Sequence, residues 1–274
     1  MDPPVALTIA GSDSGGGAGI QADLLTFAAH AVHGTSALTA ITAQSTTEVR
    51  ATLSVDPAFV ELQVRTVLDD MPVRATKTGM LATAANVRVV AQLAAEGVIP
   101  NLVVDPVLVS SSGKPLLDEG GLDAYRDLLV PRARVLTPNL FEAALLASMD
   151  LADIDSTGAM EAAARRIAEM GAELVVVKGG HLRGAISPDV VLAGGPGGEV
   201  TLLPAARVAT RNDHGTGCTF SAAIAAWLAR GAGAPEAATR AKEYVTRAIG
   251  GAATWTLGAG HGPVDHFGWG TGRP

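Results

Sequence analysis

The run HGTGC at residues 214–218 is followed at once by an alanine-rich segment, residues 219–230. This order predicts a glycine turn that leads into the start of a helix. The first backbone N–H groups of a helix have no partner within it, and the helix dipole adds partial positive charge there, so phosphate and other anions bind at such positions. Gly215 and Gly217 let the backbone approach an oxyanion closely because they carry no side chain. The run therefore indicates an anion hole, although an ordinary turn before a helix has the same pattern.

Cys218, the last residue of this run, is the only cysteine among the 274 residues. We expect the helix dipole to stabilise its thiolate, which would lower the pKa of the thiol into the physiological range and make Cys218 a candidate proton acceptor. A buried, unreactive cysteine is the alternative. A single cysteine also excludes an intramolecular disulfide framework and is typical of a reducing compartment.

Polar residues and glycines gather at the carboxyl ends of the predicted strands. In open α/β sheets, ligands bind at that edge. Ordinary turn residues also occur there, so one such residue alone means little, but a set that includes lysine and aspartate favours a binding site. The set is Gly11, Gln44, Lys77, Asp105, Asn139 and Lys178.

Several of these positions suggest phosphate and metal chemistry. Asp105 ends a buried apolar strand, where a carboxylate is costly unless it meets a cation, a metal ion or backbone donors. Asn139 and Glu142 open a helix, and their oxygens, with that of Asp105, suit Mg²⁺. An N-cap with a capping-box glutamate explains the same pair. Lys178 follows an apolar strand and precedes Gly179, so it can reach a phosphate as a point charge.

The first predicted strand runs into the glycine-rich segment GSDSGGGAG at residues 11–19. It has neither the Gly-Lys-Ser/Thr of a phosphate loop nor the G-x-G-x-x-G spacing of a dinucleotide-binding loop. A flexible loop that closes over a small ligand is the interpretation that is left. Asp23 lies one helical turn beyond and would face either that ligand or solvent.

Short apolar, β-branched segments alternate with longer helical patterns rich in alanine and leucine, which predicts βαβ units in an α/β fold with a mainly parallel sheet. The expected strands are 5–10, 36–43, 75–78, 102–105, 135–137 and 174–178, with a hairpin of 190–192 and 200–203 near the sheet edge. The expected helices are 19–29, 57–70, 84–96, 121–129, 140–147, 160–170, 216–230 and 235–250. We find no linker and no internal repeat, so residues 1–274 are expected to form one domain. Its tail, residues 258–274, is rich in glycine and proline and would be loose or docked.

The chain is acidic, with a formal net charge of -7 and a pI near 5.3. This balance argues against nucleic acid or an acidic membrane as the main partner. The start lacks the basic and apolar regions of a signal peptide, and no apolar stretch free of charges and glycines is long enough to cross a bilayer. We therefore expect a cytoplasmic protein that handles phosphate with local donors rather than with its overall charge.

Together these motifs resemble those of the hydroxymethylpyrimidine/phosphomethylpyrimidine kinases, thiamine-biosynthesis enzymes of the ribokinase-like superfamily. The resemblance covers nearly the whole chain in the same order. Two positions depart from it, since Ser14 stands where proline is common and Ser45 where asparagine is frequent. The segments that carry it are 10–13, 16–23, 39–46, 77–81, 105–107, 137–139 with 142–143, 177–181, 214–218 and 260–264.

The resemblance implies a single ribokinase-like domain, a three-layer sandwich in which a central, mostly parallel sheet lies between helices, with ATP and substrate at its carboxyl edge. It implies phosphorylation of 4-amino-5-hydroxymethyl-2-methylpyrimidine, then of its monophosphate to the diphosphate, with ATP and Mg²⁺, by a homodimer. Gln44 would hydrogen-bond the pyrimidine, in a pocket lined by Asp23, Gly11, Met80 and Val107.

The same resemblance assigns the phosphate side of the site. Asp105, Asn139 and Glu142 would organise phosphates and water, and Asp105 and Glu142 would hold Mg²⁺, partly through water. Lys178 would contact phosphate. The catalytic group would be Gly215, Thr216 and Gly217 as the anion hole, with Cys218 as a base or as a group that orients the hydroxyl.

Three alternatives stay open. A pyridoxal-type kinase of the same superfamily comes first, since both rings carry a hydroxymethyl group. A non-catalytic ligand-binding relative is less favoured, because Asp105, Lys178 and the anion hole are all present. A dinucleotide-binding oxidoreductase is disfavoured by the missing glycine fingerprint.

Overall fold

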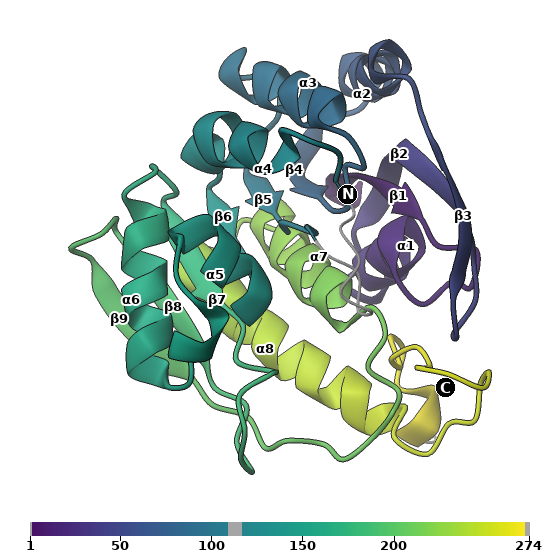
Figure 1. Cartoon of the computed structure of the whole chain (residues 1–274). Helices are drawn as coiled ribbons and strands as arrows, with labels where there is room; N and C mark the ends of the chain where they lie inside the picture. Colours follow the sequence, from purple (N-terminus) through teal and green to yellow (C-terminus); the bar gives the residue numbers. More distant parts are fainter. Residues whose placement is uncertain (1, 109–116, 272–274) are drawn as a thin grey trace.

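The computed structural model describes residues 2–108 and 117–271 of the chain. Within these residues, nine strands form one sheet in the order β3-β2-β1-β4-β5-β6-β7-β8-β9 (Figure 1). Neighbouring strands from β2 to β7 are parallel, and the edge strands β3, β8 and β9 are antiparallel to their neighbours. The strands are β1 (Val5–Ser12), β2 (His33–Gln44), β3 (Val49–Ser54), β4 (Val73–Thr78), β5 (Leu102–Val104), β6 (Val135–Leu136), β7 (Leu174–Val177), β8 (Asp189–Ala193) and β9 (Glu199–Leu203).

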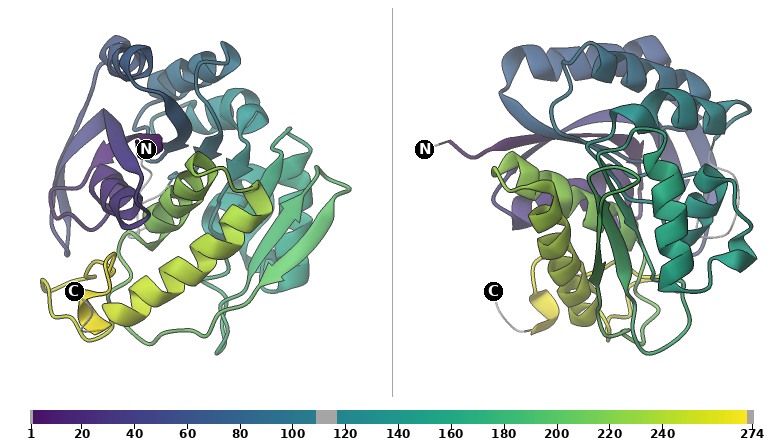
Figure 2. Two further views of the ribbon diagram at one scale, coloured as in Figure 1. Left: turned by 180° about the vertical axis from the view of Figure 1, so that it is seen from behind. Right: turned by 90° about the vertical axis from the view of Figure 1, so that its left-hand side faces the viewer.

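Helices cover both faces of the sheet and make the predicted three-layer sandwich (Figures 1 and 2). On one face lie α1 (Gly19–Ala29), α7 (Thr216–Ala229) and α8 (Ala234–Gly251). On the other lie α2 (Pro57–Asp70), α3 (Ala84–Ala95), α4 (Gly121–Ala124), α5 (Leu140–Ala147) and α6 (Thr157–Ala168).

Alternate residues of the central strands supply the two cores. In β1, Leu7 and Ile9 pack under α2 and α3, whereas Ala6 packs under α7. In β7, Val175 and Val177 face one core and Val176 faces the other. This period of two follows from the pleat of a strand, and a run such as LVVV is buried on both sides because helices cover both faces of a parallel sheet.

Two details differ from the expected elements. The edge strand β3 was not predicted, and all six of its residues are exposed, so it has no buried side to produce an alternating pattern. Residues 121–129, expected as one α-helix, form α4 followed by a π-helical turn, Tyr125–Leu129, and a 3-10 turn, Val130–Arg132. Wider π turns of this kind relieve the backbone where one helix cannot keep a single register.

The tail is docked along the part that the structure describes, up to residue 271; residues 272–274 lie outside it. The buried Asp265 carboxylate accepts hydrogen bonds from four successive amides, Phe267 to Gly270, and its own amide donates to Ala248 O in α8. Asn212 donates to the carbonyls of Ala252 and Trp255. None of the helices in the described residues is both long enough and apolar enough to cross a membrane.

Candidate active site

The predicted glycine turn before a helix is confirmed at residues 214–218. Gly215 has a φ of 78° and precedes the first residue of α7, Thr216. A Cβ at Gly215 would collide with the carbonyl oxygen of Gly17, so only glycine fits here. The amides of Gly217 and Cys218 have no hydrogen-bond partner among the residues that the structure describes. They are therefore free to donate to an anion, as the helix start requires.

Asp105 and Lys178 form an ion pair against this turn. Lys178 Nζ lies 2.9 Å from Asp105 Oδ1, and the hydroxyl of Thr137 donates to the same oxygen at 3.3 Å. A Cβ built on Gly217 would lie 3.2 Å from Lys178 Nζ and 3.8 Å from Asp105 Oδ2. Burial disfavours the charge of Asp105, but Lys178 and Lys77 outweigh it and hold the pKa of Asp105 below its ordinary value.

Asn139 and Glu142 lie beside this pair and form the capping box of α5. The Asn139 side chain accepts from the Glu142 amide at 3.0 Å, and Glu142 Oε2 accepts from the Asn139 amide at 2.7 Å. Asn139 also forms a β-bridge with Lys178. Burial raises the pKa of Glu142 to about 8, and the negative charge of Asp105 adds to this rise while Lys178 opposes it. The capping interpretation is confirmed. The bridge between Asn139 and Lys178 joins the capping box to the ion pair, so one cluster contains Asp105, Asn139, Glu142 and Lys178.

Cys218 corrects one expectation. It is half-buried, and the amide of Gly19 donates to its sulfur. Burial raises the pKa of the thiol to about 11, and the carboxylates of Asp23 and Asp105 add to the rise although Lys77 opposes it. The expected lowering at the helix N-terminus is therefore wrong for the ligand-free protein, because removal of the sulfur from water outweighs the helix dipole. At neutral pH the thiol keeps its proton.

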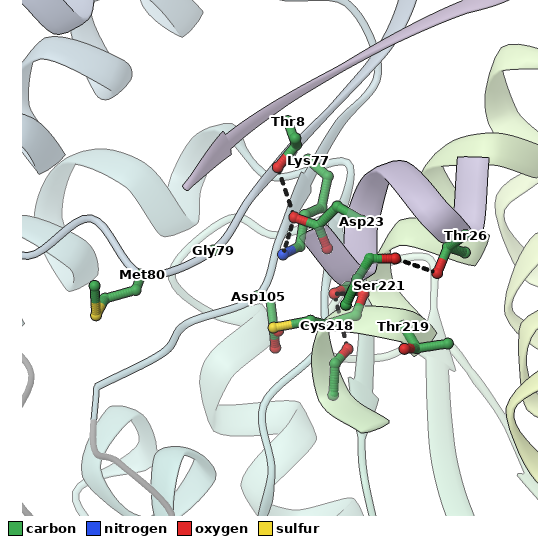
Figure 3. A network of polar contacts seen from close by, with 12 residues as sticks. Thr8, Asp23, Thr26, Lys77, Gly79, Met80, Asp105, Cys218, Thr219 and Ser221 are labelled. Atoms are coloured by element: carbon green, nitrogen blue, oxygen red, sulfur yellow. Dashed lines mark hydrogen bonds and ion pairs between the residues drawn. The ribbon is translucent and has the colours of Figure 1, made fainter. Parts of the chain in front are cut away.

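Asp23 corrects another. It was expected to line the substrate pocket, but its side chain is fully buried (Figure 3). Its Oδ2 lies 2.9 Å from Lys77 Nζ and accepts from the Thr8 hydroxyl at 2.6 Å. A carboxylate on the inner side of α1 needs a cation, and Lys77 on β4 supplies it. Its other oxygen, Oδ1, is buried and has no hydrogen-bond partner among the described residues.

The other residues predicted for the substrate pocket lie at the carboxyl edge. The amide of Gly11 donates to Met80 O at 3.1 Å, and a Cβ at Gly11 would lie 2.5 Å from the Met80 methyl group. Val107 is half-buried and follows Asp105, whose carbonyl accepts its amide at 2.9 Å. Gln44 is half-buried at the end of β2.

Ser14 fixes the backbone of Gln44. The Ser14 hydroxyl donates to Gln44 O at 2.8 Å and accepts from the Gln44 amide at 2.8 Å. A proline, common at this position in the family that the chain resembles, could make neither bond. The departure at Ser14 therefore ties the glycine-rich loop to the substrate side of the site.

Sequence reasoning missed Asp13 and His214. Asp13 is buried, and its carboxylate accepts from the amides of Gly15, Gly17 and Ala18 and lies 2.8 Å from His214 Nε2. These bonds tie three amides of the glycine-rich loop and the His214 ring to one carboxylate, and closure of the loop over a ligand stays a prediction. An aspartate two residues before a glycine is a signal for such an Asx turn.

The docked tail joins the two ends of the site. The Gly260 amide donates to Thr46 Oγ1 at 3.2 Å, and the His261 amide donates to Thr46 O at 3.1 Å. The next residue, Gly262, accepts from the His214 amide at 3.1 Å. Residues 260–262 therefore bridge the turn after Gln44 and the anion-hole turn.

The family described as phosphomethylpyrimidine kinase matches residues 13–265 of the chain. The chain belongs to this family. It is 46% identical over 267 residues to the hydroxymethylpyrimidine/phosphomethylpyrimidine kinase of Synechococcus elongatus, with 97% of this chain and 98% of the relative covered. The predicted resemblance is thereby confirmed.

Solved structures agree with this phosphomethylpyrimidine kinase fold. An ADP complex of Bacillus subtilis pyridoxal kinase superposes with a TM-score of 0.88 at 38% identity, covering 97% of this chain and 98% of the other. The phosphomethylpyrimidine kinase of Clostridium difficile superposes with a TM-score of 0.77 at 36% identity, covering 89% and 99%. The ribokinase-like three-layer sandwich is therefore confirmed.

Proposed function

We propose that this kinase transfers phosphate from ATP to 4-amino-5-hydroxymethyl-2-methylpyrimidine, and then to its monophosphate to give the diphosphate. The observation that carries the proposal is the packing of the Asp105–Lys178 ion pair against Gly217, next to a turn whose His214 reaches Gln44. The Gln44 amide, which we assign to the ring, and the HGTGC turn, which we assign to phosphate, thus lie side by side. The names of the curated relatives support the same reaction.

On the substrate side, we assign the ring contact to Gln44, whose amide offers a donor beside an acceptor. A 4-aminopyrimidine offers the complementary pair, its amino group beside a ring nitrogen. Gly11, Met80 and Val107 would line the remainder of the ring pocket.

On the phosphate side, catalysis of phosphoryl transfer is mostly positioning and charge stabilisation. The free amides of Gly217 and Cys218 and the cation of Lys178 supply donors where the transferred oxygens would lie. Since the Cys218 thiol is protonated at neutral pH in the ligand-free protein, we assign it to orienting the substrate hydroxyl. The second transfer needs no base, because its acceptor is an ionised phosphate.

A Mg²⁺ ion fits the pair Asp105 and Glu142. Burial raises the pKa of Glu142 to about 8, and the charge of Asp105 adds to the rise although Lys178 opposes it, which supports a divalent cation as a further source of positive charge beside Lys178. The described residues contain no group of three or more acidic, histidine or cysteine side chains placed to hold a metal, so water and phosphate oxygens would complete the shell, as is usual for Mg²⁺. When bound, the ion would neutralise charge on the nucleotide phosphates.

We also propose a cytoplasmic homodimer. The single cysteine supports a reducing compartment. Ile41, Val49 and Leu53 on the β2–β3 hairpin are exposed apolar side chains, which supports a second copy as their partner. Sedimentation analysis would give twice the chain mass if this is right and the chain mass if it is wrong.

The test of the function compares kcat/KM for the aminopyrimidine alcohol, its monophosphate and pyridoxal. We expect preference for the alcohol and clear turnover of the monophosphate. Preference for pyridoxal without monophosphate turnover would instead support a pyridoxal kinase, as the Bacillus subtilis protein that is 38% identical to this chain is named. Cys218→Ala is expected to lower kcat for the alcohol by about 100-fold, the scale of misplacing a reacting group, and to affect the monophosphate less.

Gln44→Ala tests the ring contact. We expect a rise in KM for the pyrimidine and little change in KM for ATP, because Gln44 lies on the substrate side of the site. Equal rises for both substrates would contradict a ring contact.

A further inference from the structure

His214 lies between Asp13 and Gln44 and can only act as a donor toward both. Its Nε2 is 2.8 Å from Asp13 Oδ2 and 3.4 Å from Gln44 Nε2. Burial disfavours the charge of Asp13, but its hydrogen bonds from His214, Gly15 and Ala18 outweigh that effect and hold its pKa below the ordinary value. An ionised carboxylate only accepts, so Nε2 of His214 carries a proton and donates it to Asp13.

Thr42, on the other side of the Gln44 amide, can only accept. Its hydroxyl donates its one proton to Ser12 O at 2.8 Å, and the same oxygen lies 3.2 Å from Gln44 Oε1. With the amide nitrogen toward His214 and the amide oxygen toward Thr42, two donors face each other and one hydroxyl proton serves two acceptors. A half-turn of the amide about χ3 removes the donor–donor contact and lets the NH2 group donate to Thr42 Oγ1, with no other group moved. The Nε2 proton of His214 is then shared between Asp13 Oδ2 at 2.8 Å and the amide oxygen at 3.4 Å. Amide oxygen and nitrogen have the same shape, so the hydrogen-bond partners decide between them.

We propose that His214 and Thr42 hold the Gln44 amide with its oxygen toward His214 and its NH2 group toward Thr42, and so select a ring with an amino group beside a ring nitrogen. This inference rests on the proposed function, which places Gln44 against the pyrimidine. The amide oxygen keeps a second lone pair for the amino group, and the nitrogen keeps a second proton for the ring nitrogen. An amide free to turn would present the reversed pair half of the time and would bind such a ring in two orientations.

Packing and hydrogen bonds hold the imidazole of His214 in place. The ring packs directly on Gly17, where a Cβ would collide with it. The His214 amide donates to Gly262 O at 3.1 Å, so the backbone of His214 is held by the docked tail. Asp13 itself accepts three backbone amides of the glycine-rich loop. His214 is therefore a positioning residue that acts on the substrate through Gln44.

Two pairs of variants test the proposal. His214→Leu removes the donor and keeps bulk, whereas His214→Gln can place an amide N–H near the position of Nε2. Thr42→Val removes the hydroxyl and Thr42→Ser keeps it, at a residue away from the anion hole. We expect His214→Leu and Thr42→Val to raise KM for the aminopyrimidine alcohol by about 10- to 50-fold, the scale of one lost hydrogen bond in a buried site. His214→Gln and Thr42→Ser are expected to recover most of this loss.

The comparison compound is 5-hydroxymethyl-2-methylpyrimidine, which lacks the amino group. Its KM is expected to rise by less than the KM for the aminopyrimidine, because it keeps the ring-nitrogen contact with the amide and lacks only the amino contact. The KM for ATP is expected to change by no more than about twofold in all four variants. Equal losses for both pyrimidines, a loss in kcat with unchanged KM, or His214→Gln no better than His214→Leu would overturn the proposal. Circular dichroism and thermal melting show whether each variant is folded, and the Thr42 pair stands if a His214 variant is not.

Affinities of the two pyrimidines for the wild type and for three variants separate this inference from the proposed function. If Gln44→Ala leaves the affinity for both pyrimidines unchanged, the ring contact itself is wrong. If Gln44→Ala weakens binding of the aminopyrimidine more than that of the comparison compound while His214→Leu and Thr42→Val bind the aminopyrimidine as the wild type does, the ring contact stands and the orientation by His214 and Thr42 is refuted.

Discussion

Lys77 Nζ lies 2.9 Å from Asp23 Oδ2, and neither side chain reaches solvent. The pair joins β4 to α1 directly beneath the reacting end of the site (Figure 3). Burial opposes the charge of Lys77, but the carboxylates of Asp23 and Asp105 hold its pKa above the ordinary value, so it stays cationic. An ion pair, rather than a single acidic residue, therefore underlies the thiol of Cys218.

Lys77→Met leaves the Asp23 charge buried without its cation. We expect the free energy of unfolding to fall by about 3–5 kcal/mol, as for other buried pairs that lose one partner. The double variant Lys77→Met/Asp23→Asn removes both charges and is expected to recover a large part of that loss. Urea unfolding of the two variants and the wild type measures this coupling, and a double variant less stable than Lys77→Met would show that no such pair stabilises the fold.

The pKa of about 11 for Cys218 predicts a slow thiol. Only the thiolate attacks iodoacetamide. As long as the pH is below the pKa, the thiolate fraction increases about tenfold for each unit by which the pH is raised. The ligand-free protein is therefore expected to react slowly at pH 7–8 and to speed up until the pH nears the pKa. Because Cys218 is the only cysteine, mass spectrometry reports on it alone, with Cys218→Ser as the unlabelled control. Fast labelling at pH 7, as for an activated cysteine, would restore the original expectation of a lowered pKa.

His266 predicts loss of stability in acid. It is buried with its Nε2 3.1 Å from the Thr219 hydroxyl, and burial lowers its pKa from 6.5 to about 4. The folded state prefers the neutral ring, so the contribution is complete above pH 6.5 and is lost as the pH falls toward 4. Compared with His266→Gln, which does not titrate, the wild type is expected to lose about 2–3 kcal/mol more between pH 7 and pH 4. Chemical denaturation at several pH values gives both curves, and parallel curves would mean that His266 does not titrate differently in the two states.

Gly179 and Gly180 form a matched pair of positions after Lys178. A Cβ at Gly179 would collide with the carbonyl oxygen of Pro188, whereas a Cβ at Gly180 meets nothing within 4 Å. The Gly179 amide also donates to Asp189, which pairs with Lys242 of α8. Overpacking is therefore expected to cost Gly179→Ala about 1–3 kcal/mol of unfolding free energy and to raise KM for ATP by moving Lys178.

Gly180→Ala is the control for that change. We expect its stability to stay within about 0.5 kcal/mol of the wild type, since the added methyl group is exposed. Equal effects of the two substitutions in denaturation and in KM for ATP would mean that the contact with Pro188 does not hold Lys178 in place.

Strand ends and helix starts could be predicted from the sequence, because apolar runs and capping residues mark them locally. Asn139 and Glu142 show this, since the same spacing that predicts a cap forms one. The partners across the sheet could not be predicted in the same way. Asp23 faces Lys77 because α1 packs its inner side on the sheet, and which side of a weakly amphipathic helix turns inward depends on the assembled fold.

The thiol of Cys218 shows a second limit. The helix start was predicted, and its dipole favours a thiolate. The opposing cost of burial depends on how closely α1 and β4 cover the sulfur, which no local pattern contains. His214 was missed for a similar reason: a histidine beside glycines carries no signal for an aspartate some 200 residues earlier in the chain, its partner in the folded protein.

The stretch from Gly260 to Gly262 leaves the ribosome after every strand and after both α7 and α8. A nascent chain can thus contain all the strands and helices of its sheet and two cores before it contains the residues that connect the turn beyond Gln44 with the HGTGC turn. The hydrogen bonds that join this stretch to Thr46 and His214 can form only once the chain has been made as far as Gly262. A chain cut before Gly260 would therefore lack this connection between the turn beyond Gln44 and the HGTGC turn.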